Sequence, residues 1–177
     1  MNPGRIIVIA GLPGAGNTTT ARRLAQRLPR AAHVEADEMQ RLIVSGGVWP
    51  EARDMSAEAH TQLRLRLHHA CLLSRSFADA GIDAVVDDII IGSRVDDLLD
   101  ELSVAPFHLV MLAPAFATIV DRWKAMASPY VDAWSWMDDE LHHRTRRVGL
   151  WLDTTDRTPD QVVDDIVERL DDALVSP

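Results

Sequence analysis

The glycine-rich segment Gly11–Thr18 constrains this chain more than any other part of its sequence. It reads Gly-Leu-Pro-Gly-Ala-Gly-Asn-Thr, and it fits the phosphate-binding pattern G-x-x-x-x-G-K-[ST] at every fixed position except Asn17. An apolar, β-branched run over 5–10 precedes the segment, and helix-forming residues over 18–28 follow it. A strand, a glycine loop and a helix in this order are the context in which the pattern binds nucleotide phosphates. A glycine-rich turn without a ligand is the alternative, and these flanks disfavour it.

The chemistry of such a loop is divided between its backbone and its side chains. Glycines let successive backbone N–H groups point at one anion, at the positive end of the following helix. We expect the Thr18 hydroxyl to bind Mg²⁺ and Thr19 to support the α-phosphate. A lysine at position 17 would place a mobile charge on the β- and γ-phosphates, whereas Asn17 is short and neutral. The expected nucleotide contacts within the loop are Gly11, Leu12, Pro13, Gly14, Ala15, Gly16, Asn17, Thr18 and Thr19.

Composition limits the partners that such a site could have. A chain of 177 residues suffices for one domain with a single core. The net charge of −9 disfavours nucleic acid and anionic membranes as partners, and no apolar stretch approaches the length of a membrane-spanning helix. Cys71 is the only cysteine, which excludes an internal disulfide and suits a reducing compartment. With no signal peptide visible, we expect a cytoplasmic protein; the sequence does not indicate its oligomeric state.

Strand-like and helical patterns alternate along the whole chain. Strands are expected near 6–10, 33–36, 84–87, 107–112 and 150–152, and helices over 18–28, 37–44, 56–80, 95–102, 115–125, 137–147 and 159–174. Ser56 and Thr158 stand at expected helix N-caps, and Gly81 follows the long central helix as a stop. Five strands that are each followed by a helix predict an α/β fold, in which helices cover both faces of a five-stranded parallel sheet.

Acidic side chains follow two of the expected strands. Asp37 comes after the second strand, and Asp87 and Asp88 end the third. Ligands of such folds bind at the carboxyl ends of the strands, where a carboxylate can serve Mg²⁺ or take a proton from an acceptor hydroxyl. The alternatives are a helix N-cap for Asp37 and a solvated turn for the pair. Apolar runs enclose the pair, and buried carboxylates need a partner such as a metal.

With these residues in place, the chain resembles the small P-loop kinases, and most closely the chloramphenicol phosphotransferase-like group. The resemblance rests on the loop, on Val34-Glu35-Ala36-Asp37, on Val85-Val86-Asp87-Asp88-Ile89 and on Trp151-Leu152-Asp153-Thr154-Thr155. It implies a single P-loop NTPase domain over 1–177, a helical lid at about 126–147, and ATP and Mg²⁺ as cofactors. It also implies roles for Asp37 as the general base, for Asp87 or Asp88 on the Mg²⁺ or acceptor side, and for Arg122 as a lid cation. The Asp153–Thr158 turn would border the adenine, with Thr155 as a nucleotide contact.

The sequence departs from this family at two cations. Asn17 replaces the loop lysine, and Met126 stands where a second lid arginine is expected, four residues after Arg122. Three arginines beyond the lid could compensate, since one well-placed cation can change the rate by roughly 10³ or more. The alternative is that they only complement the negative end of a helix. These arginines are Arg144, Arg146 and Arg147.

Aromatic residues occur in the segments expected to bind the acceptor, and one of them lies in a glycine-rich loop. Trp49 follows a Gly-Gly loop and is expected to contact substrate together with Asp37, Asp88 and Arg144. Trp134 and Trp136 are expected to pack within the lid region.

Two functions remain open. The first is an ATP-dependent O-phosphotransferase acting on a hydroxyl of a small molecule such as an antibiotic, a sugar or a related metabolite, with Asp37, Asn17 and Arg122 at the reaction centre. The second is a nucleotide-binding protein that has lost catalysis.

Overall fold

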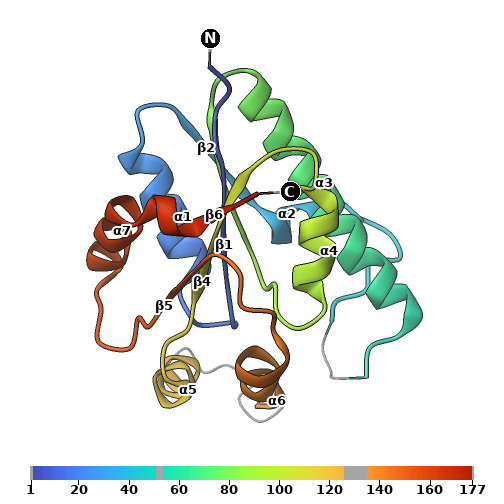
Figure 1. Ribbon diagram of the computed structural model, residues 1–177. Helices are drawn as coiled ribbons and strands as arrows, with labels where there is room; N and C mark the ends of the chain where they lie inside the picture. The colour runs from blue at the N-terminus through green and yellow to red at the C-terminus, as the bar shows by residue number, and fades with distance from the viewer. Residues whose placement is uncertain (1, 51–53, 126–134, 177) are drawn as a thin grey trace.

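One mixed sheet forms the centre of the molecule, in a computed structural model that describes residues 2–50, 54–125 and 135–176 (Figure 1). Its five parallel strands lie in the order β2-β3-β1-β4-β5, which confirms the predicted α/β fold. Parallel strands must be joined by long crossover connections, which are usually helices, and helices form these connections here. The strands are β1 (Ile6–Gly11), β2 (Ala31–Glu35), β3 (Asp83–Asp88), β4 (Phe107–Leu112) and β5 (Leu150–Leu152).

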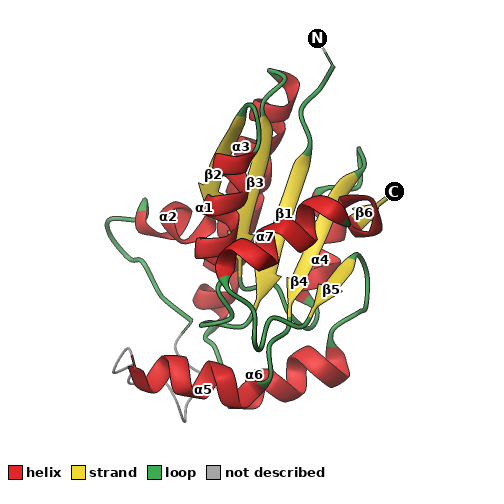
Figure 2. Ribbon diagram, turned by 90° about the vertical axis from the view of Figure 1, so that its left-hand side faces the viewer, coloured by secondary structure: helices red, strands yellow, loops and turns green. Residues whose placement is uncertain are grey.

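Helices cover both faces of this sheet. α1 (Asn17–Arg27) and α7 (Pro159–Glu168) lie on one face, and α3 (Ala57–Asp79) and α4 (Arg94–Glu101) lie on the other (Figures 1 and 2). Each face of the sheet has its own hydrophobic core, and successive side chains of β1 point alternately into the two. Ile7 and Ile9 pack with α1 and α7, whereas Val8 packs with α3 and α4. α5 (Phe116–Ala125) and α6 (Trp136–Asp139) lie beyond the carboxyl ends of the strands (Figure 2).

The capping residues recognised in the sequence take the expected positions. Ser56 is the N-cap of α3, and its hydroxyl accepts a hydrogen bond from the Ala59 amide at 3.1 Å. Thr158 forms a capping box with Gln161 at the start of α7, where Pro159 is the first helical residue. Gly81 follows α3 with a φ of +73°, a left-handed conformation that favours glycine.

Three predicted helix boundaries are wrong. The helix expected over 37–44 is α2 (Ala36–Arg41), and the helix expected over 137–147 is α6 followed by a π-helical turn, Glu140–Arg144. The helix expected over 159–174 ends at Glu168. A 3₁₀ turn, Leu170–Ala173, and a short strand, β6 (Leu174–Val175), follow it.

Tertiary contacts account for two of these differences. β5 is short and pairs only with the second half of β4, so β6 pairs antiparallel with Phe107 and His108 at the first half. After α2, the loop at 46–48 is held by side chains instead of helical hydrogen bonds. Gln62 donates to the Gly46 carbonyl at 2.8 Å, and Gln40 donates to the Val48 carbonyl at 3.0 Å.

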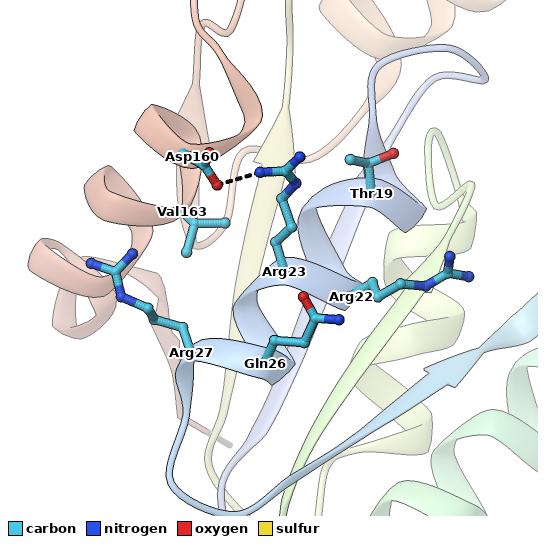
Figure 3. Close-up of a pocket in the computed structure, with 7 residues that line it drawn as sticks. All are labelled: Thr19, Arg22, Arg23, Gln26, Arg27, Asp160 and Val163. Atoms are coloured by element: carbon cyan, nitrogen blue, oxygen red, sulfur yellow. Dashed lines mark hydrogen bonds and ion pairs between the residues drawn. The ribbon is translucent and has the colours of Figure 1, made fainter.

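Ion pairs join α1 to α7 across a shallow cavity of about 590 Å³ (Figure 3). Arg23 pairs with Asp160, and one turn further along both helices Arg27 pairs with Asp164 at 2.8 Å. All four side chains are exposed, so each pair contributes at most about 1 kcal/mol. Within the described residues, no helix is both long enough and apolar enough to span a bilayer.

Candidate active site

The carboxyl ends of β1, β3 and β2 bring the candidate residues together. β1 runs into the glycine loop, β3 ends in Asp87 and Asp88, and β2 runs into α2 with Asp37. Between them lies a cavity of about 760 Å³, a volume within the range of about 300–1,000 Å³ typical of small-molecule sites. Its lining comprises Pro13, Gly14, Ala15, Gly16, Asn17, Thr18, Thr19, Thr20, Asp37, Asp87, Asp88, Ile89, Arg122, Ala125, Thr154, Arg157, Pro159 and Val162.

The backbone of the loop has a conformation that depends on glycine. Gly14 and Gly16 have φ values of +81° and +105°, in the left-handed region. A Cβ atom on Gly14 would lie 2.7 Å from Nε1 of Trp123, a side chain that is buried against the loop. α1 begins immediately after Gly16, so the N–H groups of its first turn are free to bind an anion in the cavity.

The Asn17 side chain bonds back onto its own loop. Its Nδ2 donates to the Gly11 carbonyl at 3.0 Å and to the Leu12 carbonyl at 3.4 Å. Its Oδ1 is buried, and no described residue donates a hydrogen bond to it. The side chain therefore closes the loop internally and brings no positive charge to the cavity.

Thr18 and Asp87 form the oxygen-rich part of the site. The Thr18 hydroxyl donates to Oδ2 of Asp87 at 2.6 Å, and Nε2 of His33 lies 2.5 Å from Oδ1. A hydroxyl and a carboxylate are ligands suited to Mg²⁺, which usually takes one or two carboxylates and completes its shell with water and substrate phosphates. The described residues contain no group of three or more His, Cys, Asp or Glu side chains placed to hold a metal. The donors present thus fit Mg²⁺ only together with a nucleotide.

Asp37 and Asp88 share one buried arginine. Arg66 donates from Nη1 to Oδ1 of Asp37 at 2.7 Å, and its Nη2 pairs with Oδ1 of Asp88. Asp88 also accepts from Nη2 of Arg94 at 2.9 Å and from the Ile89 amide at 2.7 Å. Asp88 lines the cavity, but its two oxygens are already in ion pairs with arginines, and Mg²⁺ would have to displace them.

Asp37 is the second residue of α2, and Glu35 holds the N-cap position instead. Burial raises the pKa of the Asp37 carboxyl above its usual range. The positive charge of Arg66 opposes this shift, the negative charge of Asp88 adds to it, and Arg41 and Asp87 act more weakly. A carboxylate with a raised pKa is a stronger base, so it is suited to accept a proton.

Two arginines line the cavity beside the loop. Arg122 donates from Nη1 to the carbonyls of Gly14 and Ala15, at 3.0 and 3.1 Å. Arg157 also lines the cavity, and its Nη1 lies 2.8 Å from Oδ2 of Asp165. Arg122 was expected from the sequence, whereas Arg157 was missed, although it belongs to the 153–158 turn that the family resemblance implies for adenine.

Five predicted contact residues do not line this cavity: Gly11, Leu12, Thr155, Arg144 and Trp49. Gly11 is the last residue of β1, and the Leu12 side chain is fully buried in the core. The Thr155 hydroxyl accepts from the Ala115 amide at 2.8 Å and bonds to Asp153, so it stabilises the turn. Arg144 faces Asp139, at 3.4 Å. Trp49 is 40% exposed, and the Arg41 guanidinium lies 5.8 Å from its ring centroid.

A neighbour of Thr155 lines the cavity, whereas two further candidate arginines form contacts outside it. Thr154 lines the cavity instead of Thr155, and its buried hydroxyl has no partner among the described residues. Arg146 pairs with Asp96 at 3.6 Å, and Arg147 stacks 4.5 Å above the Trp151 ring. Met126 and Trp134, with residues 126–134 of the expected lid, lie outside the described residues.

Arg66 was not recognised as a site residue from the sequence, yet a signal was present. It lies three residues after Leu63 and four residues before Ala70, both of which are buried on the same helix face. A single arginine on the apolar face of a helix indicates a buried charge, and a buried charge needs an acidic partner.

Comparisons with known proteins support the fold at low sequence identity. No protein-family model matches the chain, and no curated protein sequence matches it. Among solved structures, a sugar kinase from Janibacter sp. HTCC2649 is similar, with a TM-score of 0.69 and 20% identity over 97% of this chain and 96% of that one. The tunicamycin resistance protein of Deinococcus radiodurans has a TM-score of 0.69 and 23% identity over 98% and 99% of the two chains.

A gluconokinase from Sinorhizobium meliloti 1021 is also similar, with a TM-score of 0.65 and 16% identity over 96% of this chain and 93% of that one. Two of these three structures are of kinases, and the chain shares the α/β fold of all three.

Proposed function

We propose that this protein is an ATP-dependent O-phosphotransferase that acts on a hydroxyl group of a small molecule. The observation that carries this proposal is the meeting of the glycine loop and Asp37 in one cavity. Phosphoryl transfer needs the donor phosphates to be held and a base to be placed beside the acceptor, with little covalent chemistry from the protein. We also propose that the protein is related to the chloramphenicol phosphotransferase-like group, which it resembles in the loop, at Asp37, at Asp87-Asp88 and in the 151–155 segment.

In this reaction the backbone of the loop and the N-terminus of α1 bind the phosphates of ATP. Thr18 and Asp87 are the residues that would hold Mg²⁺, which when bound neutralises charge on the phosphates. Asp37 takes the proton of the acceptor hydroxyl as the acceptor oxygen bonds to the γ-phosphorus. The bond from that phosphorus to the bridging oxygen breaks, and ADP leaves. Arg122 and Arg157 are the cations of the cavity that can stabilise the transferring charge.

We propose a sugar, a sugar acid or a hydroxyl-bearing antibiotic as the acceptor. The similar structures include a sugar kinase, a gluconokinase and a protein of tunicamycin resistance. A first panel of acceptors therefore contains neutral sugars, sugar acids and hydroxyl-bearing antibiotics, each offered with MgATP.

Asp37→Asn is the variant that tests the proposal. We expect it to abolish phosphate transfer while MgATP still binds, because the amide cannot accept the proton but the phosphate contacts remain. Transfer of labelled γ-phosphate to the acceptor panel measures the first effect, and calorimetry measures the second. Asp97→Asn is the matched control, since Asp97 is not in the cavity and pairs with Arg64 at 3.8 Å. Unchanged turnover in Asp37→Asn would rule out Asp37 as the base.

A second function is favoured by one observation, the inward turn of Asn17. Its amide bonds to loop carbonyls and brings no charge to the phosphates, as in a protein that binds nucleotide without transferring phosphate. This alternative predicts MgATP binding with no transfer to any acceptor, and no gain of transfer in Asn17→Lys.

A further inference from the structure

Arg66 carries a buried positive charge to which the proposed reaction gives no role. It lies in the middle of α3 and is 3% exposed, on a buried helix face that also carries Leu63 and Ala70. Burying a guanidinium is unfavourable unless carboxylates compensate it. The contacts of its two terminal nitrogens therefore indicate its role.

Those contacts fix the guanidinium between the two acidic side chains of the acceptor side. Nη2 pairs with Asp88, whose side chain is 1% exposed and which is itself held by Arg94 and by the Ile89 amide. Nη1 donates to Oδ1 of Asp37 at 2.7 Å. Arg94 and the Ile89 amide hold Asp88 in place independently of Arg66. The Arg66 guanidinium, paired with this fixed carboxylate, therefore has a defined position from which to orient Asp37.

Asp37 is held at only one of its oxygens. Its side chain is 41% exposed, and no described residue donates a hydrogen bond to its Oδ2. Since Asp37 lines the cavity, this second oxygen is available to a hydroxyl group there. One oxygen is bound to the protein and the other is free for the substrate.

We propose that Arg66 is a positioning residue for the general base, which holds Oδ1 of Asp37 so that Oδ2 accepts the proton of the acceptor hydroxyl. This inference rests on the proposed function, because it concerns Asp37 as the base. Arg66 acts through Asp37 and does not itself contact the transferred group. Burial raises the pKa of Asp37, and the positive charge of Arg66 opposes that rise by favouring the ionised form, as Arg41 does more weakly.

A titration of the Asp37 carboxyl separates this role from simple burial of a charge. The side-chain carboxyl of Asp37 is followed by ¹³C NMR against pH, and its resonance is assigned by its loss in Asp37→Asn. We expect the midpoint to move to higher pH in Arg66→Met, because the ionised form loses its cation. In Arg66→Lys we expect a smaller shift, since the ammonium keeps the positive charge but not the two-pronged contact with Asp37 and Asp88. MgATP affinity, measured by calorimetry, should stay unchanged in both variants.

Arg64→Met is the matched control, on the same helix with an exposed side chain that pairs with Asp97. It should leave the Asp37 midpoint where it is. An Asp37 midpoint in Arg66→Met equal to that of the unmodified chain overturns the inference. If Arg66→Met does not fold, Arg66→Lys decides, and an unshifted midpoint there overturns it equally. The titration needs no turnover, so a shifted midpoint without transfer to any acceptor contradicts the kinase function and leaves the Arg66–Asp37 coupling standing.

Discussion

Position 17 has an amide where the phosphate-binding pattern has an ammonium group, and the amide turns inward to the Gly11 and Leu12 carbonyls. The positive charge that a nucleotide would meet comes from elsewhere. Arg122 lies against the loop, and Arg157 enters the cavity from the turn before α7. At the scale of single residues, the site therefore has its cations on side chains from segments outside the loop.

This arrangement predicts that both arginines contribute to nucleotide affinity. Arg122→Gln and Arg157→Gln should each weaken MgATP binding by about 10-fold, the equivalent of one charge-assisted hydrogen bond. Calorimetric titration of MgATP measures the change. Arg64→Gln, outside the cavity, is the control and should bind as the unmodified chain does. Full affinity in both cavity variants would mean that the backbone alone holds the phosphates.

At the scale of elements, the glycine loop and α5 are fitted to each other. Trp123 of α5 packs where a side chain on Gly14 would lie, and Phe116 meets the Trp123 ring edge to face at 5.9 Å. The conformation of the loop thus depends on a helix that begins about 100 residues later in the chain. A change at Gly14 should act on the nucleotide site and on stability together.

Gly14→Ala tests this fit, and Gly46→Ala is its control. Both glycines have positive φ, +81° and +73°, so both variants should lose roughly 1–2 kcal/mol from backbone strain. Gly46 has open space around it, whereas Gly14 faces Nε1 of Trp123 at 2.7 Å. We expect the larger loss in Gly14→Ala, measured as the free energy of unfolding in urea. Equal losses in the two variants would show that Trp123 yields without strain.

At the scale of the whole molecule, an ion pair at the opposite end of the sheet from the cavity links the starts of β1 and β3. Arg5 donates to Asp83 from its backbone amide at 2.7 Å and from Nη2 at 2.6 Å. Partial burial acts to raise the pKa of Asp83, but the hydrogen bonds and charge of Arg5 outweigh it and lower the pKa below its usual range. Asp83 therefore stabilises the folded chain above its unfolded pKa, and this contribution is lost as the pH falls through the lowered folded pKa.

Acid unfolding measures this contribution. Below about pH 4, the ordinary value for an aspartate, the unmodified chain should lose stability more steeply than Asp83→Asn, which has no carboxylate to protonate. Urea unfolding at a series of pH values gives both slopes. Parallel slopes for the two proteins would mean that Asp83 titrates alike in the folded and unfolded chains.

The features that local patterns determine could be predicted from the sequence. The five parallel strands, the glycine loop and the caps at Ser56 and Thr158 depend on residues close together in the chain. The carboxyl-end rule then predicted that Asp37 and Asp87 meet the loop, and the structure places all of them around one cavity.

The features that depend on distant contacts could not be predicted in the same way. Arg66 meets Asp37 and Asp88 only because α3 packs beside β3. β6 forms because the short β5 leaves part of β4 unpaired, and its two residues look like the end of a helix in the sequence. Thr154 lines the cavity instead of Thr155 because the neighbouring hydroxyl is used within the turn.

The central claim is that this cavity binds MgATP although its loop has no lysine. Calorimetric titration of MgATP into the unmodified chain and into Asn17→Lys tests it most directly. We predict that both proteins bind, and that the lysine variant binds about 10- to 100-fold more tightly through one added charge-assisted contact. No binding by the unmodified chain, with binding restored only by the lysine, would contradict the claim and make Asn17 a disabling residue.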